Sequence, residues 1–126
     1  MPAGNRSSGE IGSILLGSTD PERLADWYCT AFGGKRDPHG PCLFGDVAIL
    51  FEHRDDVSST NAEPGRHIVN FGVEDANASS EYLDSLGVHW LVPLEEREDG
   101  WFGTIVDPDG NYVQIIQFKS EYLNGG

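Results

Sequence analysis

The stretch IGSILLGSTDPERLADWYCTAFGG, residues 11–34, combines a short apolar run with a well-marked amphipathic helix. Asp20 can cap the free amide groups at the helix start, and Pro21 suits the first turn because proline has no N–H to leave unpaired. Gly33 can adopt the left-handed conformation that ends a helix. Large apolar side chains recur at helical spacing between these two ends: Leu24, Trp27, Tyr28, Ala31 and Phe32.

A second stretch, HIVNFGVEDANASSEYLDSLGV at residues 67–88, follows the same plan. It opens with an apolar run, and Asp75 marks the start of a second helix that ends at Gly87. The apolar stripe of this helix is smaller and consists of Tyr82, Leu83 and Leu86. Such self-similarity indicates that the chain is built from two copies of one structural unit.

Strand-like segments separated by turn residues follow each helix. These segments are 34–38, 41–45 and 47–53 in the first half, and 88–93, 101–106 and 111–118 in the second. The order of elements is therefore βαβββ–βαβββ, which predicts an α+β fold of two modules. We expect a flexible leader (1–10), one domain (module 1 at 11–54, linker at 55–65, module 2 at 66–119) and a tail (120–126).

The composition narrows the possible partners. A chain of 126 residues suits one domain, and its formal charge of −13 would repel nucleic acids and anionic membranes. A cationic small molecule would be attracted, although acidity most often serves only solubility. With neither a signal peptide nor a membrane-length apolar run, we expect a cytoplasmic protein, in which Cys29 and Cys42 are buried free thiols.

Two motifs, GSTDPERLADWYCTAFG and VDPDGNYVQIIQ, together with the duplicated order of elements, resemble the vicinal oxygen chelate superfamily. This superfamily includes glyoxalase I, extradiol dioxygenases, fosfomycin resistance enzymes and bleomycin resistance proteins. The resemblance covers residues 11–118. It implies two βαβββ modules whose curved mixed sheets enclose a cleft, and it implies a homodimer.

In the enzymes of this superfamily the cleft holds a divalent metal on His, Gln and Glu side chains. Counting from the matching motifs places Ser13, Ile68 and Gln114 at three of these positions, and Leu50 or Glu52 at the fourth. Isoleucine and leucine offer no donor atom, serine is a weak ligand, and glutamine offers only an amide oxygen. Glu52 is then the only possible charged ligand. Because these residues depart from the family's metal-binding pattern, we expect a cleft without a metal or another cofactor, in which Gln114 acts as a hydrogen-bonding group.

His67 is the main threat to this interpretation, since it adjoins Ile68. Strand alternation would direct His67 toward the helix layer, while Ile68, Asn70 and Gly72 line the cleft. The alternating residues Val69, Phe71 and Val73 would then form the core. A bulge or a slip of one residue would instead turn His67 into the cleft.

Several aromatic side chains lie on the strands that should form the cleft, and Trp101, between Gly100 and Gly103, is the best candidate for a stacking surface. It could equally serve core or interface packing. We assign no catalytic residue. The expected ligand-binding residues are Ser13, Leu15, Leu50, Glu52, Ile68, Asn70, Trp101 and Gln114.

The leading hypothesis is a metal-independent small-molecule-binding protein, similar to bleomycin resistance proteins that sequester an antibiotic as homodimers. Its ligand would be cationic or aromatic. One alternative is a glyoxalase- or dioxygenase-like metalloenzyme in which His67 and Glu52 bind a divalent metal after a shift of register. A third possibility is a ligand-responsive or partner-binding module.

Overall fold

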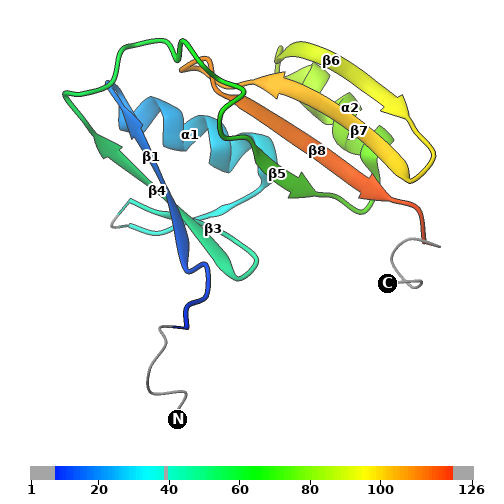
Figure 1. The fold of residues 1–126 in the computed structure, drawn as a ribbon, viewed down its shortest axis with the longest axis horizontal. Coiled ribbons are helices and arrows are strands. Elements are labelled where there is room, and N and C mark those ends of the chain that lie inside the picture. Colours follow the sequence, from blue (N-terminus) through cyan, green and yellow to red (C-terminus); the bar gives the residue numbers. More distant parts are fainter. Residues whose placement is uncertain (1–7, 39, 121–126) are drawn as a thin grey trace.

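The computed structural model describes residues 8–38 and 40–120, and its first module forms a four-stranded sheet with one helix behind it (Figure 1). Strand β1 pairs in parallel with β4, and the remaining pairs are antiparallel, so this first sheet is mixed with the order β1-β4-β3-β2. The elements are β1 (Ser13–Ser18), α1 (Pro21–Phe32), β2 (Lys35–Arg36), β3 (Cys42–Phe44) and β4 (Val47–His53).

The second module repeats this arrangement with the strand order β5-β8-β7-β6, again with one parallel pair, β5 with β8. Its elements are β5 (Val69–Gly72), α2 (Ala76–Ser85), β6 (His89–Glu96), β7 (Gly100–Val106) and β8 (Tyr112–Phe118). The predicted α+β fold of two βαβββ modules is confirmed. The main differences are a shorter β2 and a longer, bulged β6.

Helix α1 forms as its sequence predicts. The carboxylate of Asp20 accepts a hydrogen bond from the backbone N–H of Arg23 at 3.3 Å, and Gly33 has a φ of 63°, in the left-handed region. Leu24 and Tyr28 are almost fully buried. The apolar face of α1 therefore covers the first sheet and supplies much of the core.

An aromatic group connects the two modules. The ring of Phe32, at the end of α1, stacks on that of Phe71 in β5 with 3.8 Å between centroids, and Tyr28 and Phe44 also pack against Phe71. Val69 and Val73 pack against the same core. The predicted alternation of β5, with Val69, Phe71 and Val73 inward, is confirmed.

Helix α2 buries less than its stripe predicts. Leu83 is buried, but Tyr82 and Leu86 are 47% and 40% exposed. The hydroxyl of Tyr82 instead donates to the carbonyl of Thr30 at 2.8 Å, which ties α2 to the end of α1. The side chain of Tyr82 is thus directed toward the end of α1 and is not buried against the sheet.

The two cysteines form a disulfide between α1 and β3. The Cα atoms of Cys29 and Cys42 lie 6.3 Å apart, within the usual range for a disulfide. The prediction of free thiols is wrong. Strand β3 packs directly against α1, and this packing brings the two cysteines, 13 positions apart in the sequence, close enough to bond. A disulfide is uncommon in a reducing cytosol, so this bond does not support the predicted cytoplasmic location.

In the part of the chain that the structure describes, no helix combines the length and the apolar character needed to cross a membrane.

Candidate ligand-binding site

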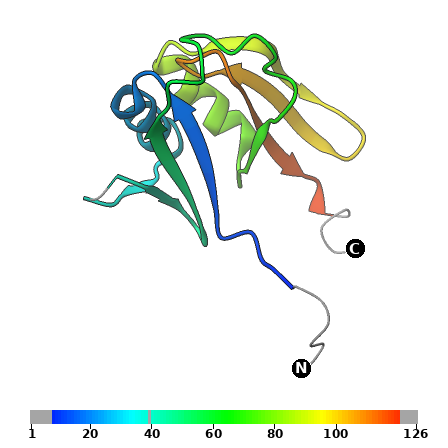
Figure 2. The same ribbon diagram turned by 60° about the vertical axis from the view of Figure 1, so that its left-hand side comes forward.

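A cavity of 920 Å³ lies where the two modules meet, between β1 and β5. Figure 2 shows these two strands on either side of the junction, with the segment that connects β4 to β5 passing over it. One wall consists of residues 14–17 and the other of residues 66–70; Tyr28 from α1 and Tyr112 from the start of β8 also line the cavity.

The lining combines an apolar wall with three asparagine residues. Ile14, Leu15 and Leu16 supply apolar surface from β1, and the side chains of the second wall are mixed. Three asparagines from different parts of the chain contribute amides: Asn61, Asn70 and Asn111. Apolar surface with a few hydrogen-bonding groups is the usual composition of small-molecule sites.

Charges within the lining are balanced. Glu63 accepts a hydrogen bond from the guanidinium of Arg66 at 2.9 Å, and both side chains are well exposed. The strong negative charge of the whole molecule is therefore not concentrated at this cavity.

The connection between the modules is attached to the turn between β7 and β8. The backbone N–H of Asn61 donates to the carbonyl of Asp109, and its side-chain amide donates to Asn111 Oδ1, both at 2.8 Å. Asn61 Oδ1 in turn accepts from the N–H of Glu63 at 2.9 Å. The amide of Asn61 therefore holds this connection in place beside the cavity.

A buried hydrogen-bond network holds Tyr28 in place at the bottom of the cavity, which we call the cavity floor. The hydroxyl of Tyr28 donates to Asp107 Oδ2 at 2.6 Å, and Asp107 also accepts from the backbone N–H groups of Asp109 and Asn111. The side-chain amide of Asn111 donates to Asp107 as well. Burial, followed by the charge of Asp107, raises the pKa of Tyr28 far above its usual 10.0, so the phenol stays protonated and serves as a hydrogen-bond donor.

Three of the residues predicted to bind a ligand line the cavity: Leu15, Ile68 and Asn70. Gln114 is the cross-strand partner of Asn70, so the two amides lie side by side on the face of the second sheet that points away from the helices. We call this face of each sheet its open face. The binding role of these residues remains a prediction.

The remaining predicted residues of the first module, Ser13, Leu50 and Glu52, share the open face of the first sheet. The register pairs Leu15 with Leu50 and Gly17 with Glu52, whereas Ile14 and Leu16 pack into the core. None of the three lines the cavity.

The comparison with known proteins agrees with the fold. A family model described as "Glyoxalase-like domain" matches residues 13–116. The chain belongs to the glyoxalase-like domain family. No curated protein matches the sequence significantly.

Solved structures of the same fold are similar along nearly their whole length. A putative glyoxalase family protein from Bacillus anthracis gives a TM-score of 0.72 at 16% identity, covering 91% of this chain and 99% of that one. A glyoxylase/bleomycin resistance protein/dioxygenase domain from Frankia sp. EAN1pec gives 0.70 at 19%, covering 90% and 100%. TioX from Micromonospora sp. ML1 gives 0.68 at 18%, covering 88% and 100%. At such low identities the comparison shows the fold alone.

The residues that the resemblance places at metal-ligand positions do not form a donor set that suits a divalent ion. Ile68 lines the cavity with an alkyl group, and Ser13 and Gln114 offer only neutral oxygens. Glu52 is half-exposed, and its carboxylate lies 3.5 Å from the guanidinium of Arg54. Among residues 8–38 and 40–120, no three His, Cys, Asp or Glu side chains converge as metal ligands would.

His67 does not point toward the helix layer as strand alternation predicted. Strand β5 begins only at Val69, so alternation does not extend back to His67 and Ile68. The imidazole is exposed, and both residues line the cavity. Of the other histidines, His53 and His89 are exposed at strand ends, and His39 lies outside the described residues.

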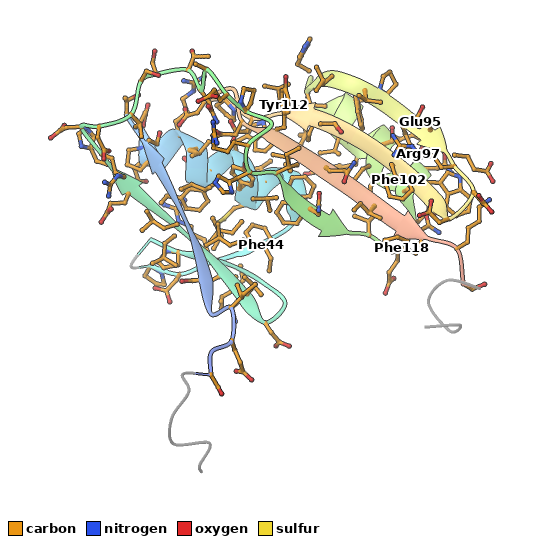
Figure 3. All side chains as sticks on the ribbon, in the orientation of Figure 1. Phe44, Glu95, Arg97, Phe102, Tyr112 and Phe118 are labelled. Atoms are coloured by element: carbon orange, nitrogen blue, oxygen red, sulfur yellow. A yellow bond between two sulfur atoms is a disulfide. The ribbon has the colours of Figure 1, made fainter. Side chains whose placement is uncertain are left out.

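Trp101 lies on the opposite face of the second sheet from Gln114, so the expectation that it flanks the cleft is wrong. Its cross-strand partner is Gln117, whose side chain accepts a hydrogen bond from the start of α2. Its neighbour Phe102 occupies the open face instead, where it packs edge-on against Phe118 at 5.9 Å (Figure 3). Phe44, Phe51 and Trp90 pack into the core.

Sequence reasoning missed the contributions of Tyr28, Asn61, Arg66 and Asn111 to the cavity. Residue 61 lies in a polar segment that has the composition of a simple linker, and Tyr28 belongs to a stripe that predicts only core packing. Asn111 could have been noticed, because it directly follows the turn Asp107–Gly110 that leads into β8.

Proposed function

We propose that this glyoxalase-like protein binds a small organic molecule in the cavity between its modules and holds it without using a metal, as in antibiotic sequestration. The observation that carries the proposal is the cavity itself. Its 920 Å³ lies within the range of about 300–1,000 Å³ typical of ligand sites. The lining has an apolar wall, three asparagine amides and a balanced pair of charges, which suits reversible binding of a drug-sized compound.

The side chains around the cavity offer little for catalysis. The hydroxyl of Tyr28 is committed to Asp107, and its raised pKa makes it a poor base. Glu63 and His67 are the other acid–base candidates in the lining. Glu63 is ion-paired with Arg66, and no carboxylate among the described residues is placed to orient His67. Binding without chemical change is therefore the activity that these residues support best.

A matched pair of variants tests this proposal. We expect a screen of flat aromatic compounds, cationic antibiotics and uncharged peptides to yield a ligand that raises the melting temperature of the protein. Ile68→Arg should weaken binding of that ligand at least tenfold, because the new side chain fills and charges the cavity. Leu91→Arg is the control, since Leu91 is exposed to a similar degree (45% against 41%) but does not line the cavity. Calorimetric titration measures both. Equal binding by the two variants would place the ligand elsewhere.

Metal analysis separates this proposal from a metalloenzyme. The one observation that favours metal is the position of His67 in the lining. Protein purified without chelator should contain far less than one divalent ion per chain. A stoichiometric ion that disappears in His67→Ala would contradict metal-independent binding.

We further propose that the protein is a homodimer. The open face of the first sheet exposes apolar surface away from the cavity, where the side chain of Leu43 is 43% exposed. A second copy would remove this surface from water. We expect sedimentation equilibrium to give twice the chain mass, and Leu43→Glu to shift the protein toward monomer. Wild-type protein that stays monomeric at high concentration would contradict the proposal.

A further inference from the structure

Two unpaired strand edges flank the cavity. Strand β1 is the last strand of the first sheet, and β5 is the last strand of the second. Within the described residues, no backbone hydrogen bond joins β1 to β5. The edge of a sheet exposes backbone N–H and C=O groups that can pair with another chain.

The hydrogen bonds between β1 and β4 identify which backbone N–H and C=O groups of β1 point away from β4. The carbonyl of Ser18 accepts from the N–H of Arg54 at 3.1 Å, so the backbone of Ser18 points toward β4. In a strand the N–H and C=O of one residue point to the same side, and successive residues alternate. Leu16 therefore also points toward β4, whereas Leu15 and Gly17 direct their backbone groups away from it. Both residues line the cavity.

The same reasoning applies to β5. The N–H of Val73 donates to the carbonyl of Ile116 in β8 at 2.9 Å, so Val73 and Phe71 point toward β8. Asn70 therefore directs its backbone groups away from β8, and it is one of the residues that line the cavity. The two walls thus both expose backbone amides.

We propose that the ligand is an uncharged, extended molecule containing peptide bonds, which adds to the edge of β1 as a further strand. Residues two apart along a strand are about 6.6 Å apart, so Leu15 and Gly17 present donor–acceptor pairs at the spacing at which an extended peptide repeats. Glu63 and Arg66 in the lining neutralise each other, so the cavity has no unpaired charge from this pair that a charged ligand would have to match. This inference rests on the proposed function and names the chemical class of its ligand.

Amide hydrogen exchange tests the pairing directly. The probe is a mixture of tetrapeptides of valine, leucine and threonine, acetylated at one end and amidated at the other. By NMR, we expect these peptides to slow exchange of the Leu15 and Gly17 amides at least tenfold. The amides of Leu16 and Ser18 are internal controls, because they point toward β4 and should change little.

A second arm alters the ligand backbone. Methylating the nitrogen of a peptide that faces β1 should weaken binding at least tenfold, while methylating the next nitrogen along should leave it nearly unchanged. On the protein, Leu15→Pro removes the outward N–H, and proline is tolerated on an edge strand at such a position. Leu15→Ala removes most of the same side chain but keeps the N–H, so it should bind the peptides more tightly than Leu15→Pro.

The outcomes separate this inference from the proposed function. If peptides bind without slowing exchange at Leu15 and Gly17, or if only compounds lacking peptide bonds bind, the inference is wrong and the ligand-binding function stands. If no compound of either kind binds, both are wrong. Slow exchange at Leu15 and Gly17 in a dimer without added peptide would assign the edge to a second copy of the chain and overturn the inference. If Leu15→Pro fails to fold, the methylated peptides still decide.

Discussion

Reduction of the disulfide between Cys29 and Cys42 is expected to lower the free energy of unfolding by about 3 kcal/mol. The bond closes a loop between residues 13 positions apart, and a loop of that length restricts the unfolded chain by about this amount. It also joins α1 to β3, so its loss loosens the helix that carries Tyr28 to the cavity floor. Urea unfolding with and without a reductant measures the difference.

The double variant Cys29→Ala, Cys42→Ala is the control for this measurement. It has no thiol, so the reductant should leave its unfolding curve unchanged. Equal stability of reduced and oxidised wild-type protein would show that the bond contributes nothing. Mass spectrometry of the alkylated protein verifies that the bond was present at the start.

Tyr28→Phe is expected to lower the free energy of unfolding by about 2 kcal/mol near neutral pH. The change keeps the ring and removes only the hydroxyl that donates to Asp107 at 2.6 Å, which leaves a buried carboxylate with one donor fewer. Tyr112→Phe is the matched control, because the Tyr112 hydroxyl makes no hydrogen bond to another described residue and Tyr112 also lines the cavity. We expect it to cost less than about 0.5 kcal/mol.

The effect of Tyr28 should also depend on pH. Its pKa in the folded protein lies above the unfolded value of 10.0, so its stabilising contribution is complete below pH 10. Above pH 10 the unfolded chain loses this proton while the folded chain keeps it. The wild-type advantage over Tyr28→Phe should then fall by about 1.4 kcal/mol per pH unit. Urea unfolding of both proteins at pH 8, 9, 10 and 11 follows this loss; a constant difference across that range would contradict the assignment.

Local signals in the sequence determined most of the fold. The ends of α1 follow from Asp20 and Gly33, because capping and left-handed glycine depend on nearby atoms only. The duplicated order of elements follows from the repeated pattern. Alternation in β5 also follows, since Phe71 and its neighbours are apolar while Asn70 is not, and only one register buries the apolar set.

Only the tertiary structure decided the contacts between residues that are far apart in the sequence. The partner of Cys29, the face on which Trp101 lies and the point at which β5 begins each depend on how α1, β3 and β8 pack, and no local pattern encodes these. The cavity is the main case, because Asn61 and Tyr28 reach it from segments whose local composition predicts a linker and a core helix. Local sequence specifies which conformation a segment adopts, whereas a binding site arises from where separate segments meet.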